Sequence, residues 1–179
     1  MPLTFASSPV KGLLIVTPRV FHDDRGFFIE TYKESDLDKA GITERFVQDN
    51  HSRSSKGVLR GLHFQRAPHA QAKLVRVTRG RLWNVAVDLR PGSPTYREWY
   101  GTELSEENRV MLYIPAGFAN GFVALEDETE LQYKCSVEYD AASDGGVRWD
   151  DPELAIRWPA RDVLVSAKDA ALPYLRDLP

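Results

Sequence analysis

Short stretches of strand-forming residues, separated by turns, recur along almost the whole of this chain. The stretches are rich in Val, Ile, Leu, Phe and Tyr, which pack well on a pleated sheet. Turn-rich pieces such as 90–94 (Arg-Pro-Gly-Ser-Pro) and 141–146 (Ala-Ala-Ser-Asp-Gly-Gly) interrupt them. This spacing predicts an all-β sandwich or barrel. The expected strands cover residues 13–17, 27–32, 45–50, 58–64, 73–78, 82–89, 110–114, 121–125 and 130–137.

Helical patterns in this sequence are few and short. One covers residues 34–40 and ends at Gly41, and Ser166 begins a Ser-Ala-Lys-Asp sequence that can cap a short turn. No internal repeat or interdomain linker is apparent, and 179 residues fall within the usual size of one domain. We therefore expect a single domain, 1–179, in which a few short helices decorate an all-β fold.

The composition limits the partners of the chain. Hydrophobic residues make up 42% and charged residues 27%, as in ordinary soluble globular proteins. The net charge of −3 is not gathered into blocks, so we expect no nucleic acid and no membrane as partners. A few Arg and Lys residues are enough to bind an anionic small ligand. Apolar runs fall far short of the roughly 20 residues that a membrane span needs.

The cysteine content and the first residues indicate a cellular compartment. Cys135 is the only cysteine, so no internal disulfide can form, which agrees with a reducing environment. The chain begins Met-Pro-Leu-Thr-Phe, without the basic start and apolar stretch of a secretory signal. We therefore expect a cytoplasmic protein.

Alternation along two of the expected strands mixes polar and apolar residues on one face. Period two places Lys73 on the same face as Val75, and Tyr133 on the same face as Leu131 and Cys135. Polar groups on a face that packs inward either pair with one another or line a ligand cavity. The pattern therefore indicates a barrel with a partly polar interior.

His63 follows a glycine in the apolar segment Arg-Gly-Leu-His-Phe-Gln. A histidine in such a setting can act as a general base near neutral pH. The other interpretation is a core histidine that is hydrogen-bonded to the backbone, and the local pattern alone leaves both open.

Metal binding is a rival function, because many small β-barrels hold a metal through a His-x-His pair, a later Glu and a further His. Here Gln65 stands two residues after His63, and the segment 115–120, where a last ligand is expected, ends in Asn120. The remaining histidines, which are His22, His51 and His69, do not restore a ligand spacing. We therefore expect no metal site.

Three further residues can carry chemistry, each with a structural alternative. Lys73 can stabilise a developing enolate oxygen, or be a solvated strand lysine. Tyr133 can donate a phenolic proton, or pack with its hydroxyl at the surface. Asp169 can orient and stabilise an imidazolium, or cap a helix start.

Two segments combine residue types that suit a nucleotide sugar. In 23–28 (Asp-Asp-Arg-Gly-Phe-Phe), an arginine can bind pyrophosphate with a forked pair of hydrogen bonds, and an aromatic face suits a nucleobase. The alternative is a turn leading into a strand with core phenylalanines. The segment 48–53 (Gln-Asp-Asn-His-Ser-Arg) suits sugar hydroxyls, or a hydrogen-bonded loop.

Taken together, these segments resemble the dTDP-4-dehydrorhamnose 3,5-epimerase family, a branch of the cupin-like double-stranded β-helix barrels. The likeness covers nearly the whole chain in order, and several multi-residue matches in series are far more specific than one motif. It implies a cupin-like jelly-roll barrel. The matching segments are 18–28, 46–53, 57–65, 73–76, 87–94, 114–122, 133–134 and 149–154.

The resemblance implies an epimerase that inverts C3 and C5 of dTDP-4-keto-6-deoxy-D-glucose to give dTDP-4-keto-L-rhamnose, without a metal or other cofactor. His63 resembles the general base, oriented by Asp169, and Tyr133 resembles the acid on the opposite face of the sugar. Lys73 would stabilise the enolate. The sequence has no dinucleotide glycine fingerprint, which agrees with a reaction that needs no redox cofactor.

The resemblance also implies a substrate-binding set and a homodimer, in which the segment around Arg25 completes the site of the neighbouring subunit. The expected partner is a dTDP-linked 4-keto-6-deoxy sugar. The residues that match contacts to nucleotide and sugar are Arg25, Phe27, Glu30, Gln48, Asn50, Arg60, Asn120 and Tyr139.

Asn120 departs from the family pattern, which usually has histidine within Gly-Phe-Ala-His-Gly-Phe. Asparagine donates and accepts hydrogen bonds but carries no charge near neutral pH. One alternative is therefore an enzyme that inverts one centre only, C3 or C5, on a dTDP-, GDP- or CDP-linked 4-keto sugar. Another is a non-catalytic barrel that binds sugar nucleotides. The presence of both proton-transfer candidates, His63 and Tyr133, favours an enzyme.

Overall fold

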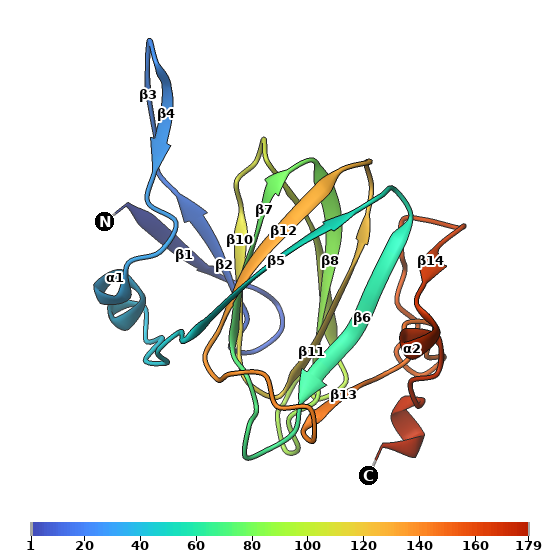
Figure 1. Ribbon diagram of the computed structural model, residues 1–179. Helices are drawn as coiled ribbons and strands as arrows, with labels where there is room; N and C mark the ends of the chain where they lie inside the picture. Colours follow the sequence, from blue (N-terminus) through green and yellow to red (C-terminus); the bar gives the residue numbers. More distant parts are fainter. Residues whose placement is uncertain (1, 179) are drawn as a thin grey trace.

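Two six-stranded sheets face each other and enclose the core of the protein (Figure 1). The structure is a computed structural model that describes residues 2–178. The first sheet has the order β1 (Leu3–Ser7), β2 (Leu14–Pro18), β10 (Met111–Ile114), β7 (Lys73–Arg79), β12 (Thr129–Cys135) and β5 (Gln48–Ser54). The second has the order β13 (Asp144–Gly146), β6 (Val58–Gln65), β11 (Phe118–Ala124), β8 (Arg81–Asp88) and β9 (Trp99–Ser105), with β14 (Leu164–Val165) paired to β6.

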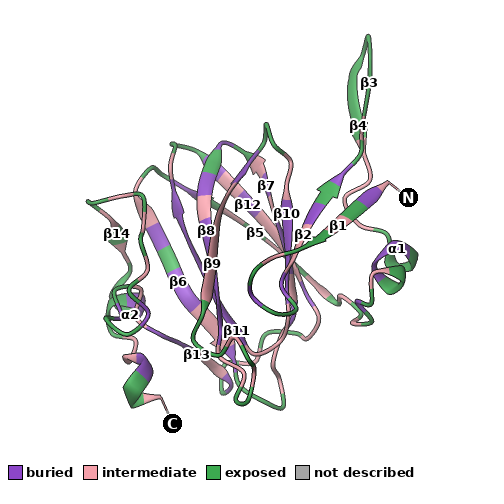
Figure 2. Cartoon of the chain, turned by 180° about the vertical axis from the view of Figure 1, so that it is seen from behind, coloured by how far each residue is buried: buried purple, intermediate pink, exposed green. Residues whose placement is uncertain are grey.

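A two-stranded hairpin projects from the barrel at one end (Figure 1). Its strands are β3 (Val20–Asp23) and β4 (Gly26–Ile29), and Figure 2 shows that most of its surface is exposed. The hairpin leads into the short helix α1 (Glu34–Lys39). Near the C-terminus lie α2 (Ala167–Ala170) and a single 3₁₀ turn, η1 (Leu175–Asp177). Within residues 2–178, no helix is long and apolar enough to cross a membrane.

The expected all-β jelly-roll fold with a few short helices is confirmed. The sequence prediction missed β9, where Gly101 and polar residues break the hydrophobic alternation. It also placed β5 three residues too early, at 45–50, because every residue of the observed strand from Gln48 to Ser54 is polar. One face of β5 borders the barrel interior and the other faces outward, so hydrophobicity gives no signal there. The prediction also missed the short strands β1, β3, β13 and β14.

The predicted alternation of strand faces is also confirmed. Val75, Leu131 and Phe122 lie in one buried cluster between the two sheets. Lys73 and Tyr133 share these inward faces by strand parity. Apolar packing therefore fills one part of the interior, and polar side chains occupy another.

Two further apolar clusters cover the outer faces of the sheets. Leu37 of α1 packs with Leu74 and Met111 on the outer face of the first sheet. Leu154 and Leu175, from the C-terminal segment, pack on the outer face of the second sheet. The segments outside the barrel are thus held by the same alternation that builds its interior, since even and odd residues of each strand serve opposite faces.

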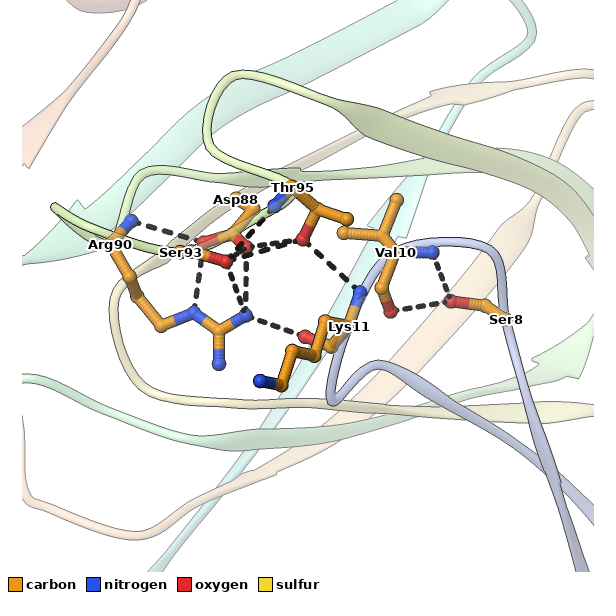
Figure 3. Close-up of polar contacts among 7 residues, drawn as sticks. All are labelled: Ser8, Val10, Lys11, Asp88, Arg90, Ser93 and Thr95. Atoms are coloured by element: carbon orange, nitrogen blue, oxygen red, sulfur yellow. Dashed lines mark hydrogen bonds and ion pairs between the residues drawn. The ribbon is translucent and has the colours of Figure 1, made fainter.

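A buried carboxylate joins two loops at the end of the barrel (Figure 3). The Asp88 side chain is 0% exposed and accepts hydrogen bonds from Arg90, Ser93 and Thr95. Arg90 also donates 2.5 Å to the carbonyl of Lys11, and the backbone N–H of Lys11 donates to Thr95. These donors hold the pKa of Asp88 well below its usual range, although burial alone would raise it. The network ties the loop before β2 to the β8–β9 loop.

We predict that Asp88→Asn lowers the free energy of unfolding by about 3 kcal/mol near neutral pH, because it leaves the partly buried Arg90 without its charge partner. The folded pKa of Asp88 lies below the unfolded value, so its stabilisation is present above about pH 4 and is lost as pH falls. The difference between the variant and wild type should therefore shrink in acid. Denaturant unfolding at several pH values measures this.

Asp177→Asn is the matched control, because Asp177 forms only an exposed 3.7 Å ion pair with Arg176. Such surface pairs contribute little to stability. Equal unfolding midpoints for the two variants at neutral pH would contradict the prediction.

Candidate active site

A cavity of about 380 Å³ opens where the inward-facing side chains of the barrel are polar. It receives residues from both sheets, with His63 from β6 and Lys73 and Tyr133 from β7 and β12. The sequence thus predicted the three groups that the fold brings together. The full lining is Gln48, Asn50, His63, Phe64, Gln65, Gln71, Lys73, Tyr133, Cys135, Tyr139, Asp144 and Lys168.

His63 and Asp169 form a hydrogen-bonded pair. The Nε2 atom of His63 lies 2.7 Å from Oδ1 of Asp169, whose other oxygen accepts from the backbone N–H of Gly61 at 3.0 Å. The Asp169 side chain is 5% exposed and that of His63 is 34% exposed. With Nε2 protonated toward the carboxylate, the lone pair of Nδ1 remains for a proton. The pair has the arrangement of an oriented general base.

The C-terminal segment places Asp169 beside His63. Parallel pairing of β14 with β6 sets Leu164 opposite Val58 and leads the chain into α2. The Ser166 side chain caps α2 by accepting from the backbone N–H of Asp169. The expected cap at Ser166 is therefore confirmed. Because the Ser166 hydroxyl accepts from the backbone N–H of Asp169, the Asp169 carboxylate is not needed as the cap and contacts His63 instead.

Two glycines bring β6 and β11 together next to His63. A Cβ atom on Gly61 would lie 2.6 Å from the Cα of Gly121, and a Cβ on Gly121 would lie 2.8 Å from the carbonyl oxygen of Arg60. Gly61 also has φ of +120°, which favours glycine. Gly61, two residues before His63, is thus required by the close approach of β6 and β11.

Lys73 presents a desolvated ammonium group to the cavity. It forms no ion pair with any of residues 2–178, and its Nζ lies 6.0 Å from the ring centroid of Tyr133. Burial lowers its pKa below the usual value. Because an unpaired cation in a poorly solvated site attracts negative charge strongly, Lys73 is suited to stabilise an anionic oxygen.

Tyr133 lies on the sheet opposite His63. Burial raises the pKa of its phenol, and the nearby Arg60 guanidinium partly offsets the increase. The phenol therefore stays protonated at neutral pH and can donate. The cavity thus has one proton-accepting group and one proton-donating group, contributed by facing sheets.

Gln48, Asn50 and Tyr139 form a connected polar border. Gln48 donates from Nε2 to Asn50 at 3.1 Å and accepts from the backbone N–H of Tyr139 at 2.8 Å. Tyr139 is 57% exposed, and its hydroxyl lies 3.3 Å from Asp144. An exposed ring held from both ends suits stacking on a planar base.

Arg60 lies on the other side of His63. It is exposed, and its guanidinium donates to Ser54 and to the carbonyl of Arg53. With His63 and Lys168 it borders an adjoining cavity of about 470 Å³. The candidate base therefore lies between the polar cavity and a cationic opening that suits a diphosphate.

Asn120 is buried and does not belong to the cavity lining. It pairs in register with His63 across β11 and β6, and its amide nitrogen donates to Asn84 and to the carbonyl of Val85. The structure thus places Asn120 beside the candidate base, with its donors directed away from it.

Arg25, Phe27 and Glu30 do not reach the cavity of their own chain. Arg25 sits at the hairpin tip and pairs with Asp23. The Phe27 ring lies 4.3 Å below the guanidinium of Arg109. The expected substrate-binding set therefore divides into residues near the cavity and residues on the projecting hairpin (Figure 1).

Sequence reasoning missed Lys168 and Asp144, which form an ion pair of 2.5 Å at the cavity edge. The position of Lys168, directly before Asp169, was a usable signal. Asp144 gave none, because it stands in a polar turn. Gln65, singled out only as a residue that replaces a metal ligand, binds three backbone groups at His69, Glu138 and Asp140.

Across residues 2–178, no three His, Cys, Asp or Glu side chains lie close enough to hold a metal ion together.

Comparison with known proteins identifies relatives over nearly the full chain. A sequence profile of the dTDP-4-dehydrorhamnose 3,5-epimerase family matches residues 7–177. A protein of that name from Methanothermobacter thermautotrophicus is 49% identical over 98% of this chain and 96% of its own. Its counterpart in Escherichia coli is 50% identical over 94% of this chain and 92% of its own. A dTDP-4-dehydrorhamnose 3-epimerase from Streptomyces niveus is 43% identical, over 89% of this chain and 78% of its own.

Solved structures agree with these relatives. The dTDP-4-dehydrorhamnose 3,5-epimerase of Elizabethkingia anophelis superposes with a TM-score of 0.95 at 45% identity, covering 99% of this chain and 98% of its own. An epimerase from Legionella pneumophila in complex with dTDP-4-keto-L-rhamnose also reaches 0.95, at 44% identity, over 99% of this chain and 95% of its own. Fold, profile and identity agree, and the chain belongs to the dTDP-4-dehydrorhamnose 3,5-epimerase family.

Proposed function

We propose that this protein inverts C3 and C5 of dTDP-4-keto-6-deoxy-D-glucose and produces dTDP-4-keto-L-rhamnose. The observation that carries the proposal is the placement of His63 and Tyr133 on facing sheets around one cavity, which the Lys73 side chain also lines. The names of relatives at 49% and 50% identity, and the ligand of the Legionella structure, supply the substrate.

The first step is removal of a proton from a carbon beside the ketone. His63 Nδ1 accepts this proton, and the imidazolium is stabilised by Asp169 at 2.7 Å. The electron pair of the broken C–H bond moves onto the ketone oxygen and forms an enolate. Lys73 stabilises that oxygen, because its ammonium is already desolvated before the charge develops.

The second step returns a proton from the opposite side of the ring. The Tyr133 hydroxyl protonates the carbanion carbon, the enolate becomes a ketone again, and the centre is inverted. The tyrosinate and the imidazolium then exchange protons with solvent and are reset. Since only protons move, neither centre requires an oxidant or a reductant.

The surrounding residues suit a nucleotide sugar. Gln48 and Asn50 offer amide groups to sugar hydroxyls, Arg60 offers a guanidinium to the diphosphate, and the exposed Tyr139 ring offers a stacking face to the base.

The projecting hairpin supports a homodimer. Phe27 is 56% and Phe28 is 64% exposed, and such aromatic exposure on one thin element is typical of an interface. Because Arg25 is remote from its own cavity, we propose that the segment around it completes the site of a second copy, where Arg25, Phe27 and Glu30 contact the nucleotide.

We also propose that residues 1–179 act as a single domain in the cytoplasm. The apolar clusters are contributed by segments from both ends of the chain, so no part forms a separate core. The one cysteine, Cys135, is buried and free, which suits a reducing compartment.

Inversion of one centre only is the second candidate. Asn120 carries no charge where the family usually has histidine, and the Streptomyces niveus relative is named a 3-epimerase. A cavity that supports proton transfer at one carbon need not support it at both. Inversion of both centres requires the sugar to place first one and then the other carbon between His63 and Tyr133.

Deuterium exchange tests these alternatives. In heavy water, we expect wild-type enzyme to introduce deuterium at both C3 and C5 of dTDP-4-keto-6-deoxy-D-glucose, measured by NMR and mass spectrometry. His63→Ala and Tyr133→Phe should each lower turnover by about 10² to 10⁴, because each removes one proton carrier. Binding of dTDP should persist in both variants.

Exchange at one carbon would favour the single-centre alternative, and binding without exchange would identify a non-catalytic barrel. Asp177→Asn, an exposed substitution outside the cavity lining, is a control for general handling of the variants. Undiminished turnover in either His63→Ala or Tyr133→Phe would remove that residue from the mechanism.

The pH dependence of kcat tests Lys73. Burial places its folded pKa below the ordinary 10.5, so the positive charge is lost as pH rises through that lowered value. We expect the alkaline decline of kcat to begin below pH 10.5 in wild type. Lys73→Arg should move the decline to higher pH, because guanidinium keeps its charge. Lys73→Met should lower kcat by about 10²-fold or more at neutral pH. An alkaline limb that is identical in wild type and Lys73→Arg would rule out this role.

Mixing two inactive variants tests the shared site. Arg25→Ala should disable the site of the partner, and His63→Ala should disable its own site. If subunits exchange freely in an equal mixture, about half of the dimers carry one intact site, so activity should return to about a quarter of wild type. No recovery after confirmed exchange would mean that Arg25 and His63 act in the same chain's site.

A further inference from the structure

Asp151 is a buried carboxylate on the outer side of the second sheet, and it lines neither of the cavities that His63 borders. The residue is 2% exposed and belongs to no ion pair within residues 2–178. Backbone N–H groups satisfy it instead. Its Oδ1 atom accepts from Glu153 at 2.8 Å and from Leu154 at 3.0 Å. Its Oδ2 atom accepts from Leu175 at 2.6 Å, so one carboxylate joins its own turn to the C-terminal segment.

The hydrogen bond to Leu175 fixes the beginning of η1. Leu175 is the first residue of this turn, and the first N–H groups of a helical turn have no acceptor within it. Leu175 is 4% exposed, and a buried N–H without an acceptor is costly. The Asp151 carboxylate is therefore the group that holds η1 against the second sheet.

A short connection leads back from Leu175 to Asp169, and it packs on the strand next to His63. Leu172 lies directly over Gly146, since a Cβ on that glycine would be 2.7 Å from the Leu172 Cδ1 atom. Gly146 pairs in register with His63. A displacement of η1 would therefore shift the part of the chain that carries Asp169.

The contacts that precede Asp169 in the chain are small. β14 has two residues in parallel pairing with β6, and α2 has four residues. A single helical turn costs more to nucleate than it returns, so it persists only where its surroundings hold it. The position of the Asp169 carboxylate thus depends on the contacts after α2 as well as on those before it.

We propose that Asp151 is a positioning residue for the reaction. By holding η1, it keeps Asp169 within hydrogen-bond distance of His63, and so fixes the imidazole ring and the nitrogen that carries its proton. The inference rests on the proposed function, because it takes His63 as the base. Asp151 acts from outside the cavity, through the segment 166–178.

Asp151→Asn removes the link to Leu175 selectively, because an amide has one accepting oxygen and one donating nitrogen. The oxygen can keep the bonds from Glu153 and Leu154, which turns the nitrogen toward the N–H of Leu175. We expect kcat for deuterium exchange into dTDP-4-keto-6-deoxy-D-glucose to fall about tenfold, the range of one hydrogen bond to a charged group, while KM changes less than about twofold.

Glu153→Gln is the matched control. It makes the same change from carboxylate to amide in the same turn, but removes only an exposed ion pair with Arg97. Its kcat should equal that of wild type. An equal loss of kcat in Glu153→Gln and Asp151→Asn would contradict a specific role of Asp151.

A cycle with Asp169→Ala separates positioning from general packing. Asp151→Asn should lower kcat about tenfold in the wild-type background, but less than about twofold in the Asp169→Ala background. Equal factors in both backgrounds would overturn the inference, because a loss of packing does not depend on the Asp169 carboxylate. Absence of exchange by wild-type enzyme would instead count against the proposed function.

Nitrogen NMR of isotope-labelled histidine gives a readout that needs no turnover. The His63 signal, assigned by its loss in His63→Ala, should show the proton on Nε2, the atom 2.7 Å from Asp169. We expect Asp151→Asn to show a mixture of both tautomers and Glu153→Gln to keep the wild-type signal. An unchanged His63 signal in Asp151→Asn would refute the positioning role even if turnover falls.

Hydrogen exchange of the wild-type protein covers the case in which Asp151→Asn does not fold. If Asp151 couples η1 to α2, the amides of Leu175 and Ala170 should open together, with protection factors that agree within about threefold. Protection that differs by about tenfold or more would mean that the two elements open independently, and the inference would fail.

Discussion

The inward faces of the barrel strands cannot all be closed by apolar packing, and the rest of the structure depends on this constraint. Val75 and Leu131 fill the interior between the sheets, but Lys73 and Tyr133 occupy the same faces two residues away. A desolvated ammonium does not pack like an aliphatic side chain, and the Tyr133 ring packs against the apolar cluster while its residue also lines the cavity. The barrel therefore keeps an open cavity at this point, and the chemistry follows from the residues that border it.

The His63–Asp169 pair joins parts of the chain that are 106 residues apart. Asp169 reaches His63 only because β14 aligns with β6, Ser166 caps α2 and Gly61 offers its N–H to the second carboxylate oxygen. Two of these contacts are long-range in the sequence, and only the Ser166 cap is local. Together they hold the candidate base on one sheet, while Tyr133 lies on the other, the arrangement that opposite-face proton transfer requires.

Strand periodicity was sufficient to predict the inward faces of β7 and β12. The period of two that places Lys73 on the same face as Val75 is visible in the sequence. It failed at β5, where both faces are polar, and at β9, where Gly101 interrupts the pattern. The candidate site was predictable where ionisable residues, such as His63, Lys73 and Tyr133, stood in segments that resemble the epimerase family. Asp144 gave no signal, since it stands in a polar turn and its partner Lys168 lies 24 residues further along the chain.

Burial acts in opposite directions on the pKa values of the two ionisable side chains that β7 and β12 contribute to the cavity. It lowers the pKa of the Lys73 ammonium, which has no acidic partner among residues 2–178 and is therefore suited to an anionic oxygen. It raises the pKa of the Tyr133 phenol, which therefore remains a proton donor rather than a second anion. The proposed proton transfer thus depends on one distribution of charge inside the barrel.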